Sequence, residues 1–265
     1  MTVGFQGEPG AFSEEAASAL FGDRVETRGY ADFDALVAAV DGGAVAVGLL
    51  PCENSIHGQI ARAYDLLYAH PAVHVIDETV HRIVQNLIGV PGARLEGIRR
   101  IESHPVALEQ CRRFLSGLGG VEAAAAADTA GAVREVVGRG DAAVGAIGPA
   151  ASAARYGGEI LAAAIQDEDA NFTRFFVVSA AGDRPRRRLG RALAALVLPH
   201  RPGSLHAALG AFAQRGLNLR ALLARPLPGR PFEYIFYAEL DCPERGEVDA
   251  LRAEIEGEMR ILGWY

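Results

Sequence analysis

The 265-residue chain contains no lysine, and all 26 of its basic side chains are arginines. Without lysine, Schiff-base and pyridoxal chemistry lose their nucleophile, and a P-loop loses the side chain that reaches the phosphates. The groups left for acid and base catalysis are histidine, carboxylates, tyrosine, cysteine and hydroxyls. The composition therefore favours a reaction that needs little covalent assistance.

Cysteine and long apolar runs are also scarce. Cys52, Cys111 and Cys242 lie far apart without CxxC spacing, which indicates reduced thiols rather than a disulfide framework or a zinc site. His70 and His74 have the spacing of metal ligands, but a proline lies between them, so we expect no metal. No apolar run approaches the roughly 18 residues that span a bilayer, and no basic signal segment is present. We expect a soluble, cytoplasmic protein with no membrane partner.

A basic surface is missing as well. The formal net charge is -7, and the arginines are scattered or confined to one segment. Binding to a phosphate backbone needs a basic face, so we expect no nucleic-acid partner. Half of the residues are hydrophobic, and a chain of this length can bury a two-lobed core and a small appended domain.

Up to about residue 180, short β-rich segments alternate with helical ones, which is typical of a sheet covered by helices. Ser13 and Asp128 are predicted N-caps, and Pro105 and Pro149 are predicted first helical residues. We therefore assign the α/β fold class. The predicted strands are 3–6, 44–50, 97–102, 121–126, 142–147, 159–163 and 173–179.

The last third of the chain has a different order of elements. Residues 181–191 are polar, charged and bracketed by glycine and proline, which indicates a solvated linker rather than an anion site. The order beyond it is βαββαβ, which predicts a ferredoxin-like sandwich. Its elements are strand 192–198, helix 204–215, strands 217–224 and 232–240, helix 245–258 and strand 259–264.

Two polar segments follow predicted strands, where open α/β sheets place ligands. Residues 7–13 precede a helix, and their backbone amides would bind a carboxylate, although glycine-rich turns also form for packing reasons. Residues 51–58 contain Asn54 and Ser55, which would either donate hydrogen bonds to an anionic substrate or cap a polar turn. These alternatives stay open on the residues alone.

Two later segments add further polar groups. Gln110 lies beside a buried helix face, where its amide needs a partner, either a substrate or a backbone carbonyl. His104 starts that helix, and we interpret it as a capping residue rather than a general base. Thr173 and Arg174 place a hydroxyl beside a guanidinium group that binds carboxylate, although threonine is also a common strand residue.

Together these segments resemble the prephenate dehydratase family over nearly the whole chain. Glu8 and Ala11 depart from the family's Gly-Pro-x-Gly-Thr-Phe-Ser element, whereas residues 51–55 are similar to its Pro-Ile-Glu-Asn-Ser element. Thr173 matches the threonine that the family regards as essential. The matching segments are 7–13, 51–55, 65–67, 103–111, 165–167 and 171–175.

The resemblance implies a two-lobed, periplasmic-binding-protein-like catalytic domain over residues 1–180, with its active site between the lobes. The lobes would be about 1–78 with 160–180, and 79–159. Residues 181–191 are the linker, and residues 192–265 resemble an ACT domain. In that domain residues 202–205 are similar to the family's Gly-Ala-Leu effector loop. Its Glu-Ser-Arg-Pro element survives as Leu223-Ala224-Arg225-Pro226.

The resemblance also assigns roles to residues. Thr173 would assist the departing hydroxyl, and the other catalytic residues would orient the substrate. The catalytic residues are Thr173, Ser103, Gln110 and Asn54. The substrate-binding residues are Gly10, Ala11, Phe12, Ser13, Glu53, Ser55, Arg174 and Phe175. The effector-binding residues are Gly203, Ser204, Leu205, Asn218, Arg225 and Pro226.

The implied function is decarboxylating dehydration of prephenate to phenylpyruvate, with L-phenylalanine as effector, no cofactor, and a homodimer or homotetramer as the assembly. Arogenate differs from prephenate only at one side-chain carbon and stays an alternative substrate. A decarboxylase that does not aromatise the ring is a second alternative. A non-catalytic amino-acid sensor is an alternative of another class.

Overall fold

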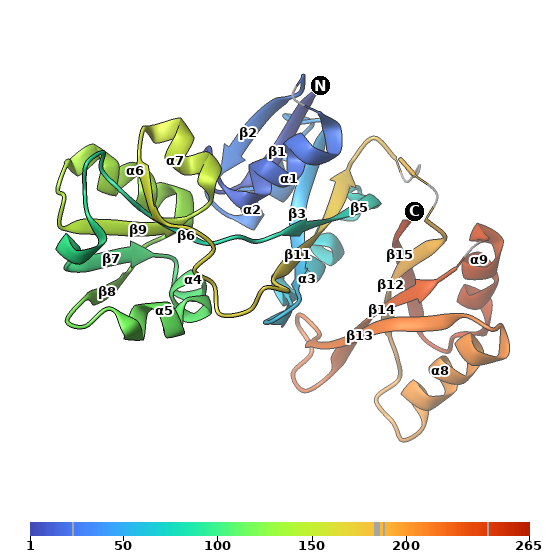
Figure 1. The fold of residues 1–265 in the computed structure, drawn as a ribbon. Helices are drawn as coiled ribbons and strands as arrows, with labels where there is room; N and C mark the ends of the chain where they lie inside the picture. Colours follow the sequence, from blue (N-terminus) through green and yellow to red (C-terminus); the bar gives the residue numbers. More distant parts are fainter. Residues whose placement is uncertain (23, 183–185, 188, 243) are drawn as a thin grey trace. The chain divides into compact units, whose positions relative to one another are not determined.

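The computed structural model describes residues 1–265 except 23, 183–185, 188 and 243. The chain forms two compact units, which are described separately (Figure 1). The first unit contains Met1–Leu36, Glu53–Gly58 and Val80–Arg174. The second contains Val37–Cys52, Gln59–Thr79 and Phe175–Tyr265.

A five-stranded sheet in the order β10-β6-β9-β7-β8 forms the centre of the first unit. β7 pairs in parallel with β8 and β9, whereas β6 pairs antiparallel with β9 and β10. Its strands are β6 (Asn86–Gly89), β7 (Arg100–Ser103), β8 (Glu122–Ala125), β9 (Val144–Gly148) and β10 (Glu159–Ala162). A short 3-10 turn, Leu95–Gly97, precedes β7.

Helices cover both faces of this sheet. Successive residues of a strand point to opposite faces, so each strand supplies side chains to both layers of helices. Leu87 and Ile147 pack against residues of α4 and α5, while their neighbours Ile88 and Ala146 pack against α6 and α7. A side chain added at Gly148 would approach Val133, so glycine allows the close packing of α6. The helices are α4 (Pro105–Gln110), α5 (Arg112–Gly117), α6 (Thr129–Arg139) and α7 (Ala150–Tyr156).

The first unit also contains the parallel pair β1 (Thr2–Gln6) and β2 (Glu26–Tyr30), with α1 (Phe12–Phe21) between them. Phe5 is fully buried and packs with Ala11 and Ala130. The next helix, α2 (Phe33–Asp41), continues into the second unit.

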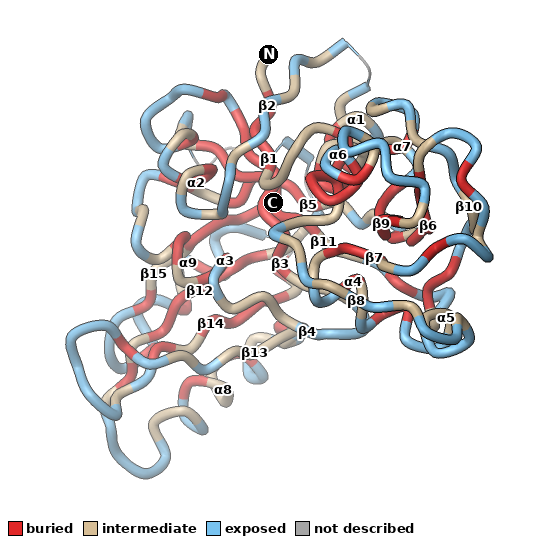
Figure 2. Tube along the Cα trace, turned by 90° about the vertical axis from the view of Figure 1, so that its left-hand side faces the viewer, coloured by how far each residue is buried: buried red, intermediate tan, exposed pale blue. Residues whose placement is uncertain are grey.

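The second unit contains the predicted βαββαβ order. β12 (Arg191–Val197) pairs antiparallel with β14 (Tyr234–Asp241) and β15 (Glu258–Trp264), and β13 (Asn218–Pro226) pairs with β14. α8 (Ser204–Gln214) and α9 (Arg245–Glu254) bury Phe212, Val248 and Leu251 against this sheet. In Figure 2, β12 and β14 run mostly through buried residues.

The strand order of this unit continues beyond the βαββαβ segment as β15-β5-β11-β3. Gly263 pairs in parallel with Val75 of β5, and a side chain at Gly263 would collide with that strand's backbone. The added elements are β3 (Val47–Asn54), β4 (Gly58–Gln59), α3 (Ala61–Ala69), β5 (His74–Arg82) and β11 (Phe172–Ser179).

Of the four predicted helix-start residues, two are confirmed and two are wrong. Pro105 begins α4, and the Asp128 carboxylate accepts from the Gly131 amide as an N-cap. Ser13 is not an N-cap, because the carbonyl of Ala11 already accepts from the amides of Glu14 and Glu15, so the helix starts earlier. The start predicted at Pro149 is one residue early, since Pro149 is itself the N-cap of α7.

The predicted linker is only partly described, because residues 183–185 and 188 lie outside the described residues. Arg186 and Arg187 both donate to the buried carboxylate of Asp77, at 2.7 and 2.8 Å. This corrects the prediction of a solvated segment for these two residues. The three cysteines are buried free thiols, as predicted. Among the described residues, no helix has the length and apolarity to cross a bilayer.

Candidate functional site

The side-chain amide of Asn54, at the end of β3, joins two segments of the first unit. Its nitrogen Nδ2 donates to Asn171 Oδ1 at 2.9 Å, to the Phe172 carbonyl at 3.1 Å and to Thr173 Oγ1 at 3.2 Å. Its oxygen accepts from the backbone amides of Ile56 and His57. Because backbone N–H groups can only donate, these two bonds fix which end of the Asn54 amide faces Thr173.

Ser55 strengthens the same junction. Its hydroxyl donates to the Ala170 carbonyl at 2.8 Å and accepts from the Phe172 amide at 2.9 Å. The backbone amide of Ser55 also donates to the Phe172 carbonyl. The loop after β3 is therefore fixed to the start of β11, and the predicted residues Asn54, Ser55 and Thr173 lie together.

The hydroxyl of Thr173 has a defined direction. Its oxygen accepts from Asn54, and in the described part of the chain its hydrogen is donated to no protein acceptor. The residue is half-buried, as expected for a group that can meet a ligand. The geometry thus leaves one O–H donor that is held in place and unused by the protein.

Arg174 is held by Glu53. Its Nε lies 3.0 Å and its Nη2 2.9 Å from the Glu53 carboxylate, and its side chain is 11% exposed. Two other acids close to Arg174 in the sequence, Asp167 and Glu168, instead lie near Arg113. The structure therefore places two predicted substrate-binding residues, Glu53 and Arg174, in one ion pair beside Thr173.

Gln110 belongs to a chain of buried amides. Its Oε1 accepts from Gln85 Nε2 at 3.1 Å, and its Nε2 lies 3.5 Å from the ring of His57. The same ring nitrogen, His57 Nδ1, lies 3.3 Å from Asn54 Oδ1, so Gln110 lies close to the Asn54 junction. The backbone amide of Gln85 donates to Gln166 Oε1. Sequence reasoning missed His57 and Gln85 as site residues, because neither type nor spacing distinguishes them from ordinary loop and strand residues.

The next predicted residue, Ser103, is fully buried at the end of β7. Its hydroxyl donates to the Ile147 carbonyl at 2.7 Å, so this group is already paired within the sheet. His104 follows as the N-cap of α4, and its ring accepts from the Val106 amide, which confirms the predicted capping role. Burial lowers the pKa of His104, which favours the neutral ring that capping requires.

In the loop before α1, one backbone amide is already bound to a carboxylate of the same segment. The Gly10 amide donates to Glu14, whose carboxylate also accepts from the Thr27 hydroxyl at 2.6 Å. Gly10 has a positive φ of 91°, and a side chain there would lie 3.0 Å from the backbone of Ser152. One amide of the predicted carboxylate-binding loop is therefore occupied by Glu14, and substrate binding there by Gly10, Ala11, Phe12 and Ser13 stays a prediction.

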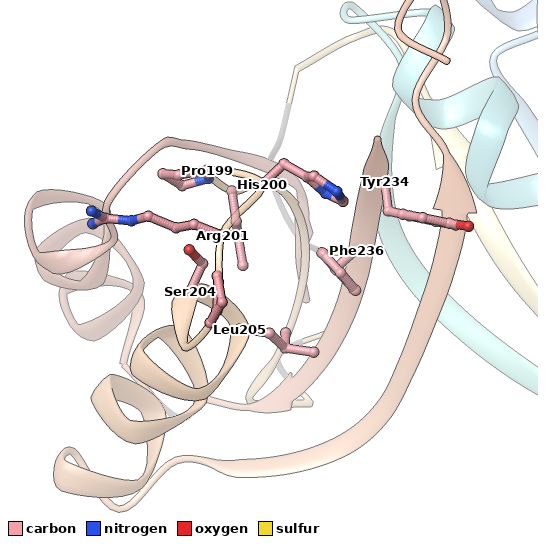
Figure 3. A pocket seen from close by; sticks show the side chains of 9 residues that line it. Pro199, His200, Arg201, Ser204, Leu205, Tyr234 and Phe236 are labelled. Atoms are coloured by element: carbon pink, nitrogen blue, oxygen red, sulfur yellow. The ribbon is translucent and has the colours of Figure 1, made fainter. Parts of the chain in front are cut away.

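The second unit contains a cavity of about 300 Å³ at the start of α8 (Figure 3). Two predicted effector residues, Ser204 and Leu205, line it, and Gly203 precedes them with a left-handed backbone. The Ser204 hydroxyl is buried without a partner among the described residues. The other lining residues are Leu198, Pro199, His200, Arg201, Pro202, Tyr234 and Phe236.

The remaining predicted effector residues lie elsewhere in this unit. Asn218 donates to Asp241, and Arg225 forms an ion pair with Asp65 of α3, with Nη2 to Oδ2 at 2.9 Å. Neither these residues nor Pro226 belong to the lining of the cavity described above. Their effector role stays a prediction.

Helix α3 is held by side chains from three strands of the βαββαβ segment, which we call the α3 contact. Arg225 of β13 pairs with Asp65, and Tyr64 donates to the buried Glu239 of β14 at 2.6 Å. Arg260 of β15 lies 4.2 Å above the Tyr68 ring and donates to the last carbonyls of α3. Sequence reasoning did not find this contact, because its partners are far apart in the chain.

A family model described as "Prephenate dehydratase" matches residues 3–183. Within the residues that the structure describes, no group of His, Cys, Asp and Glu could hold a metal ion.

Three similar proteins illustrate the matches. "Arogenate dehydratase/prephenate dehydratase 1, chloroplastic" of Arabidopsis thaliana is 37% identical, over 99% of this chain and 71% of its own. A solved prephenate dehydratase from Arthrobacter aurescens in complex with L-Phe is 27% identical, with a TM-score of 0.89 over 99% and 89% of the chains. The solved structure of GqqA, described as a novel type of quorum quenching acylase, is 31% identical, with a TM-score of 0.88 over 99% and 97%. The predicted fold class is confirmed.

Proposed function

Because the chain belongs to the prephenate dehydratase family, we propose that it converts prephenate to phenylpyruvate by decarboxylating dehydration. The observation that supports this best is the Thr173 hydroxyl, whose oxygen accepts from Asn54 while its hydrogen has no protein acceptor among the described residues. A donor fixed in this way fits a reaction in which a hydroxyl must leave.

The reaction makes limited demands on the protein. Prephenate loses its ring carboxylate as carbon dioxide, and the electron pair of that bond moves through the ring and expels the hydroxyl as the ring becomes aromatic. The protein has to orient the two carboxylates and stabilise the departing oxygen. Thr173 would donate a hydrogen bond to that oxygen, because a threonine hydroxyl is too weak an acid to lose its proton outright.

Arg174 would bind a substrate carboxylate. Glu53 contacts Nε and Nη2 of the guanidinium, and this fixes the plane of the group before substrate arrives. A preorganised guanidinium loses less conformational freedom on binding than a mobile one. Gln110 and Asn54 would orient the ring, and Ser103, Ser55, Phe175 and the loop Gly10, Ala11, Phe12 and Ser13 stay proposed site residues.

A second candidate substrate is arogenate. The relatives named arogenate dehydratase/prephenate dehydratase favour it, since the chain matches such proteins over nearly its whole length. The non-aromatising decarboxylase and the non-catalytic sensor stay alternatives. We keep the cytoplasm as the proposed location; the Arabidopsis relative is named chloroplastic.

We also propose that residues 192–265 form an ACT domain that binds L-phenylalanine, with a homodimer or homotetramer as the assembly. The solved Arthrobacter aurescens structure contains L-Phe, and this chain has an apolar cavity at the start of an eleven-residue helix. Helix N-termini bind carboxylates, while the Leu205 and Phe236 side chains would contact an aromatic ring. Calorimetry with phenylalanine, tyrosine and tryptophan tests this, and absence of binding by all three would contradict it.

A turnover assay on the full chain tests the enzymatic proposal. Purified protein is incubated with prephenate or arogenate, and the products are separated and identified by their ultraviolet spectra. Phenylpyruvate from prephenate supports the proposal, whereas a non-aromatic product indicates the decarboxylase. Absence of turnover with both substrates would favour the sensor.

A further inference from the structure

Two buried side-chain amides, one two residues before Thr173 and one bonded to the Gln85 backbone amide, have nitrogen atoms without a partner among the described residues. They are Nδ2 of Asn171 and Nε2 of Gln166, and the residues are 0% and 8% exposed. An unpaired buried N–H group destabilises the folded protein, because it has lost its hydrogen bonds to water and gained none in return. Such atoms are therefore expected where a ligand completes the hydrogen bonding.

The neighbours fix which end of each amide is unpaired. Asn54 must donate to Asn171 Oδ1, because the Asn54 oxygen already accepts from two backbone amides. Gln166 Oε1 accepts from the Gln85 backbone amide at 3.0 Å, and a backbone amide can only donate. In both residues the oxygen is used, and the unpaired atom is a donor.

Asn171 is well placed relative to Thr173. Both contact Asn54 Nδ2, at 2.9 and 3.2 Å, so Asn171 Oδ1 and Thr173 Oγ1 are no more than about 6 Å apart. This is comparable with the distance from the leaving hydroxyl, across the substrate ring, to the side chain opposite it. A substrate whose hydroxyl meets Thr173 would present that side chain toward Asn171.

Prephenate and arogenate differ at this side chain. Prephenate has a keto oxygen, which accepts hydrogen bonds, whereas arogenate has an ammonium group, which only donates. Unpaired N–H donors can be satisfied by the keto oxygen and would face another donor in arogenate. Leaving buried polar groups unpaired is a strong source of substrate discrimination.

Resting on the proposed function, we propose that Asn171 and Gln166 are specificity-determining residues that select the 2-oxo-acid side chain of prephenate over the amino-acid side chain of arogenate. The full-length protein should have a higher kcat/KM for prephenate. Asn171→Asp keeps the oxygen that faces Asn54 and replaces the donor by an acceptor. We expect kcat/KM for prephenate to fall about 10- to 100-fold and the value for arogenate to fall less.

A pH series separates this role from a structural one. Burial raises the pKa of a carboxyl group, and the protonated carboxyl of Asn171→Asp can donate again. Its kcat/KM for prephenate, relative to wild type, should therefore recover as pH falls, while the value for arogenate does not. Gln166→Glu is the second variant, because it also keeps the oxygen that accepts from Gln85.

Asn86→Asp is the matched control. Asn86 is also a buried amide, but its nitrogen lies within hydrogen-bond distance of the Val84 and Gly148 carbonyls and its oxygen accepts from the Ala164 amide. This change should alter both substrates equally. A preference of the wild type for arogenate, or an unchanged substrate ratio in Asn171→Asp and Gln166→Glu while prephenate is turned over, overturns this inference alone. Turnover of neither substrate by the wild type overturns the proposed function and this inference with it.

Discussion

Around Asn54 the contacting groups are neutral amides and hydroxyls, whereas the α3 contact consists of carboxylates, guanidinium groups and aromatic rings. The first region leaves donors of Thr173 and Asn171 unused by the protein, within the residues described. In the second, Asp65 and Glu239 each accept from a partner. The difference agrees with our proposal that a substrate binds at the first region, whereas the second holds α3 against the βαββαβ segment.

The largest loss of turnover should come from removing the Thr173 hydroxyl. Thr173→Val keeps the shape of the side chain but removes the hydroxyl, and we expect turnover to fall by about 10²- to 10⁴-fold, the usual contribution of a positioned donor. The melting temperature should change little, because the residue is only half-buried. Initial rates and thermal melts measure both, with Thr2→Val as control at an exposed hydrogen-bonded threonine. Wild-type turnover in a folded Thr173→Val variant would contradict the proposed role.

A smaller loss is expected when the ion pair beside Thr173 is changed. Arg174→Lys keeps the positive charge but cannot contact Glu53 and a substrate carboxylate through one planar group. We expect KM to rise about tenfold with a smaller change in kcat, since binding of the ground state is weakened. Steady-state kinetics over a range of prephenate concentrations measure this. An unchanged KM would indicate that Arg174 serves only to pair Glu53.

A change of charge in the α3 contact should alter inhibition by phenylalanine rather than the chemical step. Asp65→Asn removes the charge that faces Arg225, and α3 begins soon after the loop that contains Asn54. We expect phenylalanine to bind as before while the concentration needed for half-inhibition rises several-fold, because effector control requires differential contacts in two states. Calorimetry and inhibition curves measure the two effects separately.

Glu254→Gln is the control for that experiment. It breaks an exposed ion pair with Arg215 in the same βαββαβ segment but does not touch α3. Inhibition should stay normal in this variant. If Glu254→Gln weakens inhibition as much as Asp65→Asn, the effect is one of general charge and not of the α3 contact.

The smallest expected effect is a change in melting temperature, and it concerns paired charges in the first unit, away from Asn54. Hydrogen bonds from Arg139 and Arg100 lower the pKa of Glu102 below its ordinary value of 4.5. A carboxyl group whose pKa is lower in the folded state than in the unfolded state stabilises the fold at pH values above the unfolded-state pKa. This stability is lost as the pH falls through the folded-state pKa. Glu102→Gln should therefore melt a few degrees lower at pH 7, and the difference from wild type should shrink in acid. A constant difference across thermal melts from pH 7 to pH 3 would contradict this account.

The α/β pattern and the βαββαβ order could be predicted from the sequence because hydrophobic alternation and turn residues report local structure directly. β2 was missed because its residues are polar and mostly exposed, and β6 because the strand has only four residues and begins with Asn86. For the site, the segments around Asn54 and Thr173 were recognisable, but their direct contact depends on pairing between distant strands. The unpaired nitrogen of Asn171 could not be predicted, because it depends on the hydrogen bond that Asn54 Nδ2 donates to Asn171 Oδ1 in the folded protein.

Arg260 has a consequence for how this protein can be divided or recombined. Its guanidinium supplies hydrogen bonds to the carbonyls at the end of α3, which lies far earlier in the sequence. Removing residues 192–265 would take away the Tyr237 ring that packs against Tyr64 and leave those carbonyls without this donor. The C-terminal segment thus completes a helix of the preceding part, and a chimaera that exchanges it must also supply an arginine at the position of Arg260 and a partner for Asp65.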